Sequence, residues 1–411
     1  MPPAAPSRPR RILLADADAF FVAVARMVDP EGAGKARLLI VGGSRESRGV
    51  VCSASYETRK FGVRSAMPIA RALRLCPEAM CVPVPRKACS IKSREIRAVL
   101  ERFAPVVEGA SIDEWYLDLT GTEAVYHDEP LRETAHRMRD AVRRTTDLSI
   151  SIGGGTNKLI AKLAVERAKP KPGSGADGVH VVAPGREAEF LRGFALADIP
   201  LVGPKFQQRL AVLGMTAVSD VLRHDLPTLR RWLGESEADW LWNRAHGIDH
   251  AEVEAGAEAK SISRDETFAE DLREDAELER ELLALVTRAA FDLRRDGLAA
   301  RTITVRLRDM DFRNRSAGRT LDEAVVSDRV IMGVARELLA KLRKARRVPA
   351  RRLSVALSSL SSDPGADQLG LFPGDRGPLA ETDRDRALAR TVDRVREKFG
   401  AKGILPASLV D

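Results

Sequence analysis

Three acidic residues stand at the ends of short apolar segments that are far apart in the sequence. Asp16 follows the first apolar run, and the adjacent pair Asp113 and Glu114 lies between two others. A cation such as Mg²⁺ prefers oxygen ligands and keeps waters and substrate phosphates, so carboxylates at neighbouring strand ends suit it. The set is a candidate for metal-dependent phosphate chemistry. The alternatives are a helix cap at Asp16 or Asp18 and a plain turn at the acidic pair.

A second set of residues carries positive charge and one phenol. It comprises Tyr56, Arg59 and Lys60 in a glycine-flanked segment, and Lys158, Lys162 and Lys169 on a helix that follows the sequence SIGGGTN. A strand, a glycine turn and a helix start direct N–H groups and cations toward a phosphate. No Gly-Lys-Ser/Thr follows the glycines, so a Walker A loop is excluded. A solvated basic helix face is the alternative interpretation.

Length and composition limit the class of protein that must position these residues. The chain has 411 residues, 44% hydrophobic and 31% charged, which indicates a globular protein of several domains. No run approaches the ~18 apolar residues of a membrane span, and the N-terminus lacks a signal-peptide core. We therefore expect a cytoplasmic protein with no membrane contact. The four cysteines form no CxxC pair, which argues against disulfides and a zinc site.

Basic residues exceed acidic ones by 67 to 59, and they are unevenly placed. Between 341 and 352 lie seven lysines and arginines without an acid, and between 294 and 319 eight arginines face three aspartates. Such clusters favour a polyanion as the binding partner.

The order of elements predicts an α+β multi-domain protein. Strands and helices alternate to about residue 175, and short helices with Gly and Pro follow over 186–248. From Ser261 the pattern is βαββαβ, with helices at about 275–296 and 328–346, which is typical of a ferredoxin-like domain. A last helix is expected over 384–400.

Five segments in this order resemble the Y-family DNA polymerases, the translesion enzymes, and most closely their bacterial DinB type. They are DADAFF (16–21), YETRKFGVRSAMP (56–68), SIDE (111–114), TNKLIAKLAVERAKP (156–170) and KSISRDETF (260–268). The resemblance covers roughly residues 10–362. It implies a right-hand polymerase with an α+β palm (10–28 and 81–175), small fingers (29–80), an all-helical thumb (176–250), a linker (251–260), a ferredoxin-like little finger (261–362) and a tail (363–411).

The resemblance also implies the roles of the acidic residues and of the nucleotide site. Asp16, Asp113, Glu114 and the Ala17 carbonyl would hold two Mg²⁺ ions, for which Mn²⁺ can substitute. The incoming dNTP would be held by Tyr56, Arg59, Lys169 and the amides of Ala19, Phe20 and Phe21. Phe21 would be the steric gate that collides with a ribose 2′-OH. Its alternative interpretation is a core aromatic.

DNA contacts are implied at the thumb hairpin, the palm helix and the little finger. The residues are Lys158, Lys162, Gly203, Lys205, Arg306, Arg308, Arg313 and Arg315. At the hairpin, Gly203 and the helix start at Pro204 expose amides to a phosphate. Alternation along a strand places Arg306 and Arg308 on one face. Relatives more often have Gly in place of Leu201.

A short segment of the tail resembles the peptide with which bacterial polymerases bind the β sliding clamp. It contains Gln368, Leu369, Leu371 and Phe372 in a Pro/Gly/Asp-rich stretch that has no core of its own. A strand edge or a core patch is the alternative.

Two residues depart from the family pattern. Trp115 replaces a small residue beside Glu114, where its ring would either crowd the primer terminus or pack beneath the sheet. Cys89 stands where many relatives have an aromatic residue, so local packing must differ.

The sequence thus predicts a monomeric, template-directed DNA polymerase of low fidelity for translesion synthesis. Its partners would be primer-template DNA, dNTP and the β sliding clamp, and it would associate with the bacterial nucleoid. Two alternatives remain: a clamp-bound mutagenesis adaptor without catalytic activity, against which the intact acidic triad argues, and a nucleotide cyclase, which would need no thumb or clamp peptide.

Overall fold

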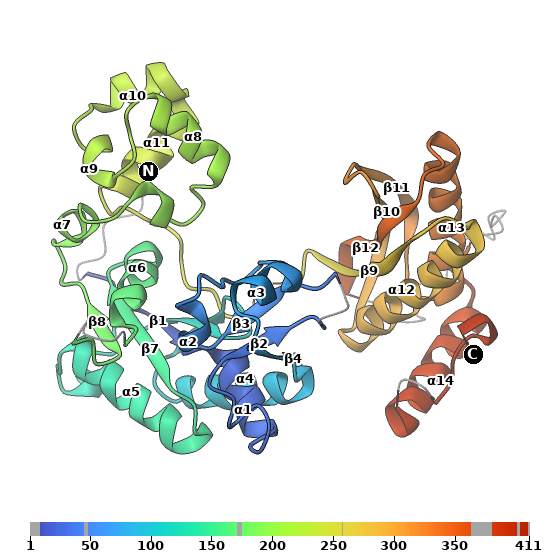
Figure 1. Cartoon of the computed structure of the whole chain (residues 1–411), viewed down its shortest axis with the longest axis horizontal. Coiled ribbons are helices and arrows are strands. Elements are labelled where there is room, and N and C mark those ends of the chain that lie inside the picture. Colours follow the sequence, from blue (N-terminus) through green and yellow to red (C-terminus); the bar gives the residue numbers. More distant parts are fainter. Residues whose placement is uncertain are drawn as a thin grey trace, which may run out of the picture. The chain divides into compact units, whose positions relative to one another are not determined.

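The computed structural model describes residues 9–44, 48–170, 175–256, 258–362, 380–400 and 403–409. The chain divides into two compact units, residues 1–257 and 258–411, which are described separately (Figure 1). Within the described residues, no helix is long and apolar enough to cross a membrane. All four cysteines are free thiols, as the sequence predicts.

A five-stranded sheet forms the centre of the first unit. Its strands, in spatial order, are β5 (Val106–Gly109), β6 (Glu114–Asp118), β1 (Ile12–Ala17), β7 (Ile150–Gly155) and β8 (Val179–Val181). Strand β1 is antiparallel to both of its neighbours and is buried along its whole length. The first strand of the sequence is therefore the middle of the sheet.

Helices cover both faces of this sheet. They are α1 (Phe20–Val28), α4 (Arg86–Leu100), α5 (Leu131–Thr146) and α6 (Lys158–Ala168), with a 3₁₀ turn at Ala124–Tyr126. Because side chains alternate along a strand, Leu13 and Ala15 face the core shared with α1, α4 and α5. Ile12 and Leu14 face Ala161 and the rest of α6 on the other side.

A smaller sheet follows α1 in sequence. It has the order β3 (Val51–Ala54), β2 (Leu39–Gly42), β4 (Met80–Pro83), and the helices α2 (Tyr56–Arg59) and α3 (Ile69–Leu75) flank it. Its core cluster is small, as the low apolar content of this segment predicts.

An all-helical region completes the first unit. It contains α7 (Glu187–Leu191), a 3₁₀ turn (Leu196–Asp198), α8 (Pro204–Val212), α9 (Val218–Val221), α10 (Leu226–Leu233) and α11 (Glu235–Ala245). After it, the chain returns to the five-stranded sheet, where Val253 packs against Ile12 and Leu14. The Glu254 N–H donates to Glu108, at 2.9 Å.

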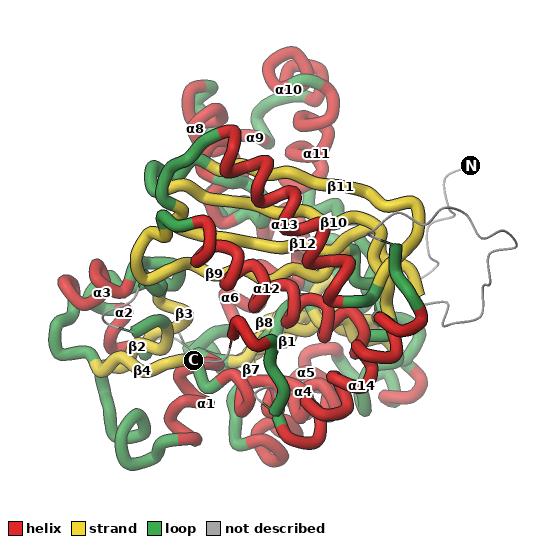
Figure 2. The backbone as a smooth tube through the Cα atoms, turned by 90° about the vertical axis from the view of Figure 1, so that its right-hand side faces the viewer, coloured by secondary structure: helices red, strands yellow, loops and turns green. Residues whose placement is uncertain are grey.

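The second unit has the predicted βαββαβ order. Its elements are β9 (Ser261–Leu272), α12 (Asp275–Arg295), β10 (Leu298–Asp309), β11 (Asn314–Val325), α13 (Asp328–Ala345) and β12 (Ala350–Ser362). The sheet order is β11-β10-β12-β9, with every neighbouring pair antiparallel. Figure 2 shows α12 and α13 lying together on one face of this sheet. That the first strand lies at an edge is a detail the sequence did not predict.

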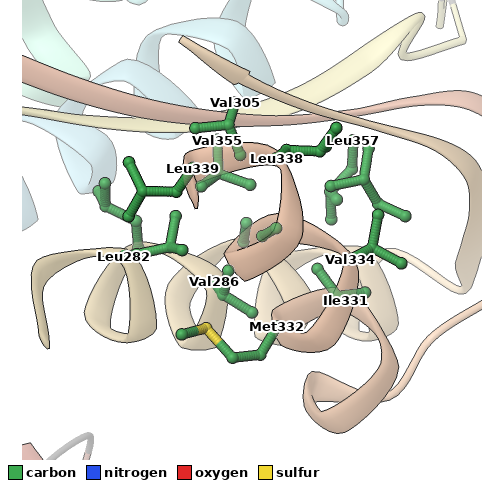
Figure 3. Packing of buried hydrophobic residues seen from close by; sticks show 14 of the residues in the cluster. Leu282, Val286, Val305, Ile331, Met332, Val334, Leu338, Leu339, Val355 and Leu357 are labelled. Carbon is green, nitrogen blue, oxygen red and sulfur yellow. The ribbon is translucent and has the colours of Figure 1, made fainter. Parts of the chain in front are cut away.

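The core of this unit lies between the sheet and the two helices. Leu282 and Val286 of α12 and Val334 and Leu338 of α13 meet Val305 and its neighbours from the sheet (Figure 3). This packing buries the helical stripe that the sequence shows at 3.6-residue spacing. The opposite face of the sheet is left to polar side chains.

The helix α14 (Asp383–Phe399) docks on this unit through charged contacts and is followed by a 3₁₀ turn at Ala407–Leu409. Arg294 of α12, whose side chain is 8% exposed, binds Asp393 of α14 and Asp328 of α13. Arg329 pairs with Asp385 at 2.7 Å. The tail helix is thus held by paired charges, which are costly to separate once desolvated.

Candidate active site and nucleic-acid interface

The acidic residues that are distant in sequence meet at the centre of the five-stranded sheet. Asp16 of β1 and Glu114 of β6 are direct cross-strand partners, which we call the carboxylate pair. Asp113 precedes β6, and its carbonyl accepts a hydrogen bond of 2.9 Å from the Ala17 N–H. The antiparallel register therefore brings Asp16, Ala17, Asp113 and Glu114 together.

Burial makes the carboxylate pair electrostatically unfavourable. Asp16 is 8% exposed. Desolvation raises the pKa of Asp16 to about 7, the ammonium of Lys169 partly offsets this, and the neighbouring Glu114 adds to the rise. Like charges directly opposed on a sheet destabilise it. A positive charge nearby would therefore stabilise the carboxylate pair.

That charge comes from helix α6 and the residue after it. Lys169 Nζ lies 3.0 Å from Asp16 Oδ2, and Lys162 Nζ forms an ion pair with Glu114. Lys158, predicted to contact DNA, instead binds Glu108 at 2.6 Å and lies over the Tyr116 ring. The structure thus brings two of the three predicted basic residues of this helix to the acidic site.

The glycines before α6 act differently from the sequence interpretation, which placed them in a phosphate-binding turn. Gly153 and Gly155 belong to the buried strand β7. A Cβ on Gly153 would lie 2.2 Å from the Ala161 carbonyl oxygen, and one on Gly155 would lie 2.3 Å from Ile160. The glycines let α6 approach the sheet closely, which is how its lysines reach the carboxylates.

The turn between β1 and α1 is strained, and hydrogen bonds from residues 149 and 151 hold it in place. Ala19 has φ 47°, a left-handed conformation that is costly for a residue with a Cβ. The Asp18 carboxylate accepts hydrogen bonds from the hydroxyls of Ser149 and Ser151, at 2.8 and 2.7 Å. Asp18 therefore does not cap helix α1, and the helix-cap alternative is ruled out for this residue. The sequence analysis missed this positioning role, which the Ser-Ile-Ser alternation in β7 could have signalled.

The predicted nucleotide residues lie around the same turn. The pKa of Tyr56 is raised by burial and then by the charges of Asp18 and Asp16. The Arg59 guanidinium lies 5.0 Å from the Tyr56 ring centroid, and its Nε donates to the Ala54 carbonyl. The first amides of α1, at Phe20 and Phe21, are the unpaired donors of any helix start.

Phe20 and Phe21 differ in burial. Phe20 is 2% exposed and belongs to the core, whereas Phe21 is only partly buried and packs edge-on against it, with ring centroids 5.6 Å apart. Phe21, unlike Phe20, therefore keeps part of its surface exposed.

Trp115 does not crowd the acidic site. It follows Glu114 on β6, so alternation turns its ring to the opposite face, where it is 1% exposed. Cys89 is 0% exposed in the same core cluster. Both side chains are thus buried in one core cluster, on the side of the sheet away from Glu114.

The acidic site fits a divalent cation by its chemistry. Its donors are carboxylate and carbonyl oxygens, which suit hard cations, and a dication would relieve the repulsion between Asp16 and Glu114. In the described part of the chain, no three His, Cys, Asp or Glu side chains are arranged to hold a metal ion. The Asp113 carboxylate accepts a hydrogen bond from the Ser111 hydroxyl, while Lys162 and Lys169 contact Glu114 and Asp16.

The helical region presents an exposed hairpin at 201–203. Gly203 has φ −77°, and a Cβ there would meet nothing within 4 Å, so neither conformation nor packing requires glycine. A ligand that approaches the backbone closely would explain the glycine at this position. Lys205 is exposed next to it in the sequence. Leu201 is 82% exposed with φ 72°, a strained conformation for leucine.

In the second unit, the sheet face opposite α12 and α13 is basic. Arg306 and Arg308 of β10 lie on it with Arg352 of β12, which we call the arginine face, around a hollow of about 340 Å³. Strand alternation predicted that Arg306 and Arg308 share this face. The sequence analysis missed Arg352, which the pairing of β12 with β10 places opposite Arg308 on the same face. Arg313 is exposed just before β11.

Arg315 is not brought to the arginine face. It pairs in register with the core residue Leu307, and its guanidinium binds the fully buried Asp309 at 2.7 Å and the Leu342 carbonyl. Its contacts in this structure are internal to the unit. The predicted clamp-binding residues Gln368, Leu369, Leu371 and Phe372 lie outside the described residues.

Family models match most of the chain. The impB/mucB/samB family model matches residues 15–166, and the model of that family's C-terminal domain matches residues 259–371.

Curated relatives are similar over nearly the whole length. A protein named DNA polymerase IV from Dehalococcoides mccartyi (strain CBDB1) is 34% identical over 96% of each chain. One of the same name from Xanthomonas euvesicatoria pv. vesicatoria (strain 85-10) is 36% identical over 90% of this chain and 99% of its own.

Solved structures agree with this similarity. A Y-family DNA polymerase chimera of Dbh and Dpo4 superposes with a TM-score of 0.73 at 26% identity, over 86% of this chain and 100% of its own. An insertion ternary complex of Dbh DNA polymerase superposes with a TM-score of 0.60 at 26% identity, over 85% of this chain and 98% of its own.

These matches define the class of protein: the chain belongs to the impB/mucB/samB family of Y-family DNA polymerases. Within it, the chain is of the DinB type, a DNA-directed DNA polymerase for translesion synthesis. The predicted right-hand fold class is confirmed, and neither the adaptor nor the cyclase alternative is favoured. Polymerases of this family use divalent metal ions.

Proposed function

We propose that the carboxylate pair, Asp113 and the Ala17 carbonyl hold two Mg²⁺ ions, with Mn²⁺ as a substitute, and that DNA synthesis takes place there. The observation that carries this is the Asp16–Glu114 register at the ends of two neighbouring strands, where a buried carboxylate faces a second, partly exposed one. When bound, such ions lower the pKa of a hydroxyl and neutralise a pyrophosphate leaving group.

The reaction joins the primer 3′-oxygen to the α-phosphorus of a dNTP and releases pyrophosphate. Tyr56, Arg59 and the amides at Ala19 to Phe21 hold the triphosphate, because they surround the turn beside the carboxylate pair. Lys169 supplies a further cation next to Asp16. With no general acid or base required of the side chains, these residues act by positioning and by charge stabilisation.

Phe21 is the steric gate in this proposal. Its partly exposed ring, backed by the buried Phe20, forms a rigid surface on which a 2′-OH would collide. The neighbouring Ala19 conformation fixes where this surface lies.

Primer-template DNA is bound by phosphate contacts at two places. In the first unit these are the open Gly203 hairpin with Lys205, and in the second unit the arginine face with Arg313. Phosphate contacts position the duplex without reading its sequence, which suits an enzyme that must copy any template.

Removing charge from the arginine face tests this interface. Arg306→Gln and Arg308→Gln should weaken primer-template binding about equally for all sequences, and each should lower the slope of log K against log salt by about one unit. Fluorescence anisotropy over a salt series measures both quantities. Arg336→Gln, on the helical side of the same unit, is the matched control and should change neither. An unchanged slope in the Arg306 and Arg308 variants would remove them from the interface.

We also propose that Gln368 to Phe372 bind the β sliding clamp. The segment lies in the sequence between β12 and helix α14, both of which belong to the second unit. A short peptide of this kind concentrates its affinity in a few apolar side chains.

A double replacement of Leu371 and Phe372 by Ala should abolish the stimulation of synthesis by a loaded clamp and leave synthesis without the clamp unchanged. Primer extension on clamp-loaded and clamp-free templates measures this. Leu388→Ala removes an exposed leucine from α14 and should keep the stimulation. Equal stimulation of the double variant and the parent would contradict the clamp contact.

The remaining expectations are a monomeric protein that works in the cytoplasm with the nucleoid. They rest on the sequence and on the two curated relatives described above, which are bacterial.

A further inference from the structure

Two lysines from one helical segment contact the two members of the carboxylate pair. Lys162 and Lys169 are seven residues apart, about two helical turns, so they project toward the same side. Lys169 contacts Asp16, and Lys162 contacts Glu114. Each carboxylate therefore has its own ammonium group.

The two lysines differ in how firmly they are held. Lys169 is shared between Asp16 at 3.0 Å and Glu166 at 2.6 Å. Across the described ranges of the chain, Lys162 forms one ion pair, with Glu114, and the two side chains are 29% and 25% exposed. Of the two contacts, the Lys162–Glu114 pair is the easier one to separate.

We propose that Lys162 is a placeholder cation: its ammonium neutralises Glu114 while no divalent ion is bound, and it competes with that ion for the carboxylate. The inference rests on the proposed metal site. Lys162 is thus a positioning residue that lowers the divalent-ion affinity of the protein when DNA and nucleotide are absent. It also keeps Glu114 oriented toward the site, since an unpaired carboxylate beside Asp16 would turn away from the repulsion.

A displaced Lys162 has room to move. Its side chain lines a hollow of about 460 Å³ between α6 and the segment 197–203, which includes the exposed hairpin at Gly203. When a metal ion takes Glu114, the ammonium can turn into this hollow, where the proposed DNA phosphate contact lies. The same lysine would then serve Glu114 in the free protein and DNA in the complex.

Helix α6 supplies a matched control. Lys158 lies one turn before Lys162, is 17% exposed in its side chain, and binds Glu108, a carboxylate outside the carboxylate pair. Replacing Lys158 by Gln removes one lysine charge from the same helix and leaves the Lys162–Glu114 pair intact.

The test is Mn²⁺ binding to the full chain without DNA or nucleotide, measured as free Mn²⁺ by electron paramagnetic resonance. Lys162→Gln should bind Mn²⁺ about tenfold more tightly than the parent, because the competing charge is gone. Lys158→Gln and Lys162→Arg should bind as the parent does. Lys162→Met, which keeps the length of the side chain, repeats the test with a second neutral residue.

Thermal unfolding gives an independent readout. In EDTA, Lys162→Gln should melt below the parent, since Glu114 has lost its partner, and Mn²⁺ should raise its Tm more than that of the parent. Equal or weaker Mn²⁺ binding by both neutral variants would overturn the proposal. So would the absence of measurable Mn²⁺ binding in parent and variants alike.

Glu114→Gln separates this inference from the site on which it rests. If Glu114→Gln loses Mn²⁺ binding while the Lys162 variants equal the parent, the metal site stands and the placeholder role fails. If Glu114→Gln binds Mn²⁺ as the parent does, the proposed metal site itself fails, and with it the inference.

Discussion

Replacing Glu114 or Asp16 by Ala should reduce primer extension by at least ~10³-fold, with primer-template binding nearly unchanged. The loss follows because both residues belong to the carboxylate pair that is proposed to hold the metal ions, whereas the proposed phosphate contacts lie at Gly203 and the arginine face. Single-turnover nucleotide insertion measures the first quantity, and fluorescence anisotropy with labelled primer-template measures the second.

Glu108→Ala is the control for these variants. Glu108 lies on the neighbouring strand β5, its side chain is 21% exposed against 25% for Glu114, and it too is paired with a lysine of α6. Its removal deletes a similar ion pair without touching the proposed metal ligands, so insertion should stay within a few-fold of the parent. Near-normal extension by both Asp16→Ala and Glu114→Ala would contradict the mechanism.

Phe21→Ala should increase ribonucleotide insertion about 10²-fold relative to deoxynucleotide insertion, a change of ~2.7 kcal/mol in discrimination. A gate works by collision, so deleting the ring removes a penalty that only the 2′-OH suffers. The ratio of kcat/KM for the two nucleotides measures it.

Phe20→Leu distinguishes a gate from a core residue. Phe20 is 2% exposed, so a smaller side chain there should lower the Tm through a cavity and leave discrimination unchanged. If Phe21→Ala instead lowers the Tm and keeps the ribonucleotide ratio of the parent, Phe21 is a core residue and not a gate.

Local patterns predicted much of this protein, because they depend on neighbours in sequence. The βαββαβ order of the second unit and the shared face of Arg306 and Arg308 follow from periodicity alone. Alternation also settles the orientation of Trp115, since a residue next to Glu114 on a strand must face the other side. That argument needed only the sequence.

What the sequence could not supply are contacts that depend on how elements pack. For the glycines after Ile152, only the approach of α6 to β7 shows that Gly153 makes room for Ala161 and Gly155 for Ile160. Likewise, the basic residues of one helix divide among Glu108, Glu114 and Asp16, which come from three different strands or their ends.

Arg315 shows the same limit in the second unit. Its sequence neighbours Asn314 and Ser316 are exposed, but the β10–β11 register turns Arg315 toward Asp309, a fully buried acid. A charged residue in this position stabilises the fold through its ion pair. Its orientation can be predicted only when the register between the two strands is known.

The most direct test of the central claim is single-nucleotide primer extension by the parent protein with Mg²⁺, on four undamaged templates that differ only in the templating base. A template-directed polymerase should add mainly the complementary deoxynucleotide to each primer, and EDTA or Glu114→Ala should prevent it. A protein that adds nothing, or adds the same nucleotide whatever the template base, would contradict the account.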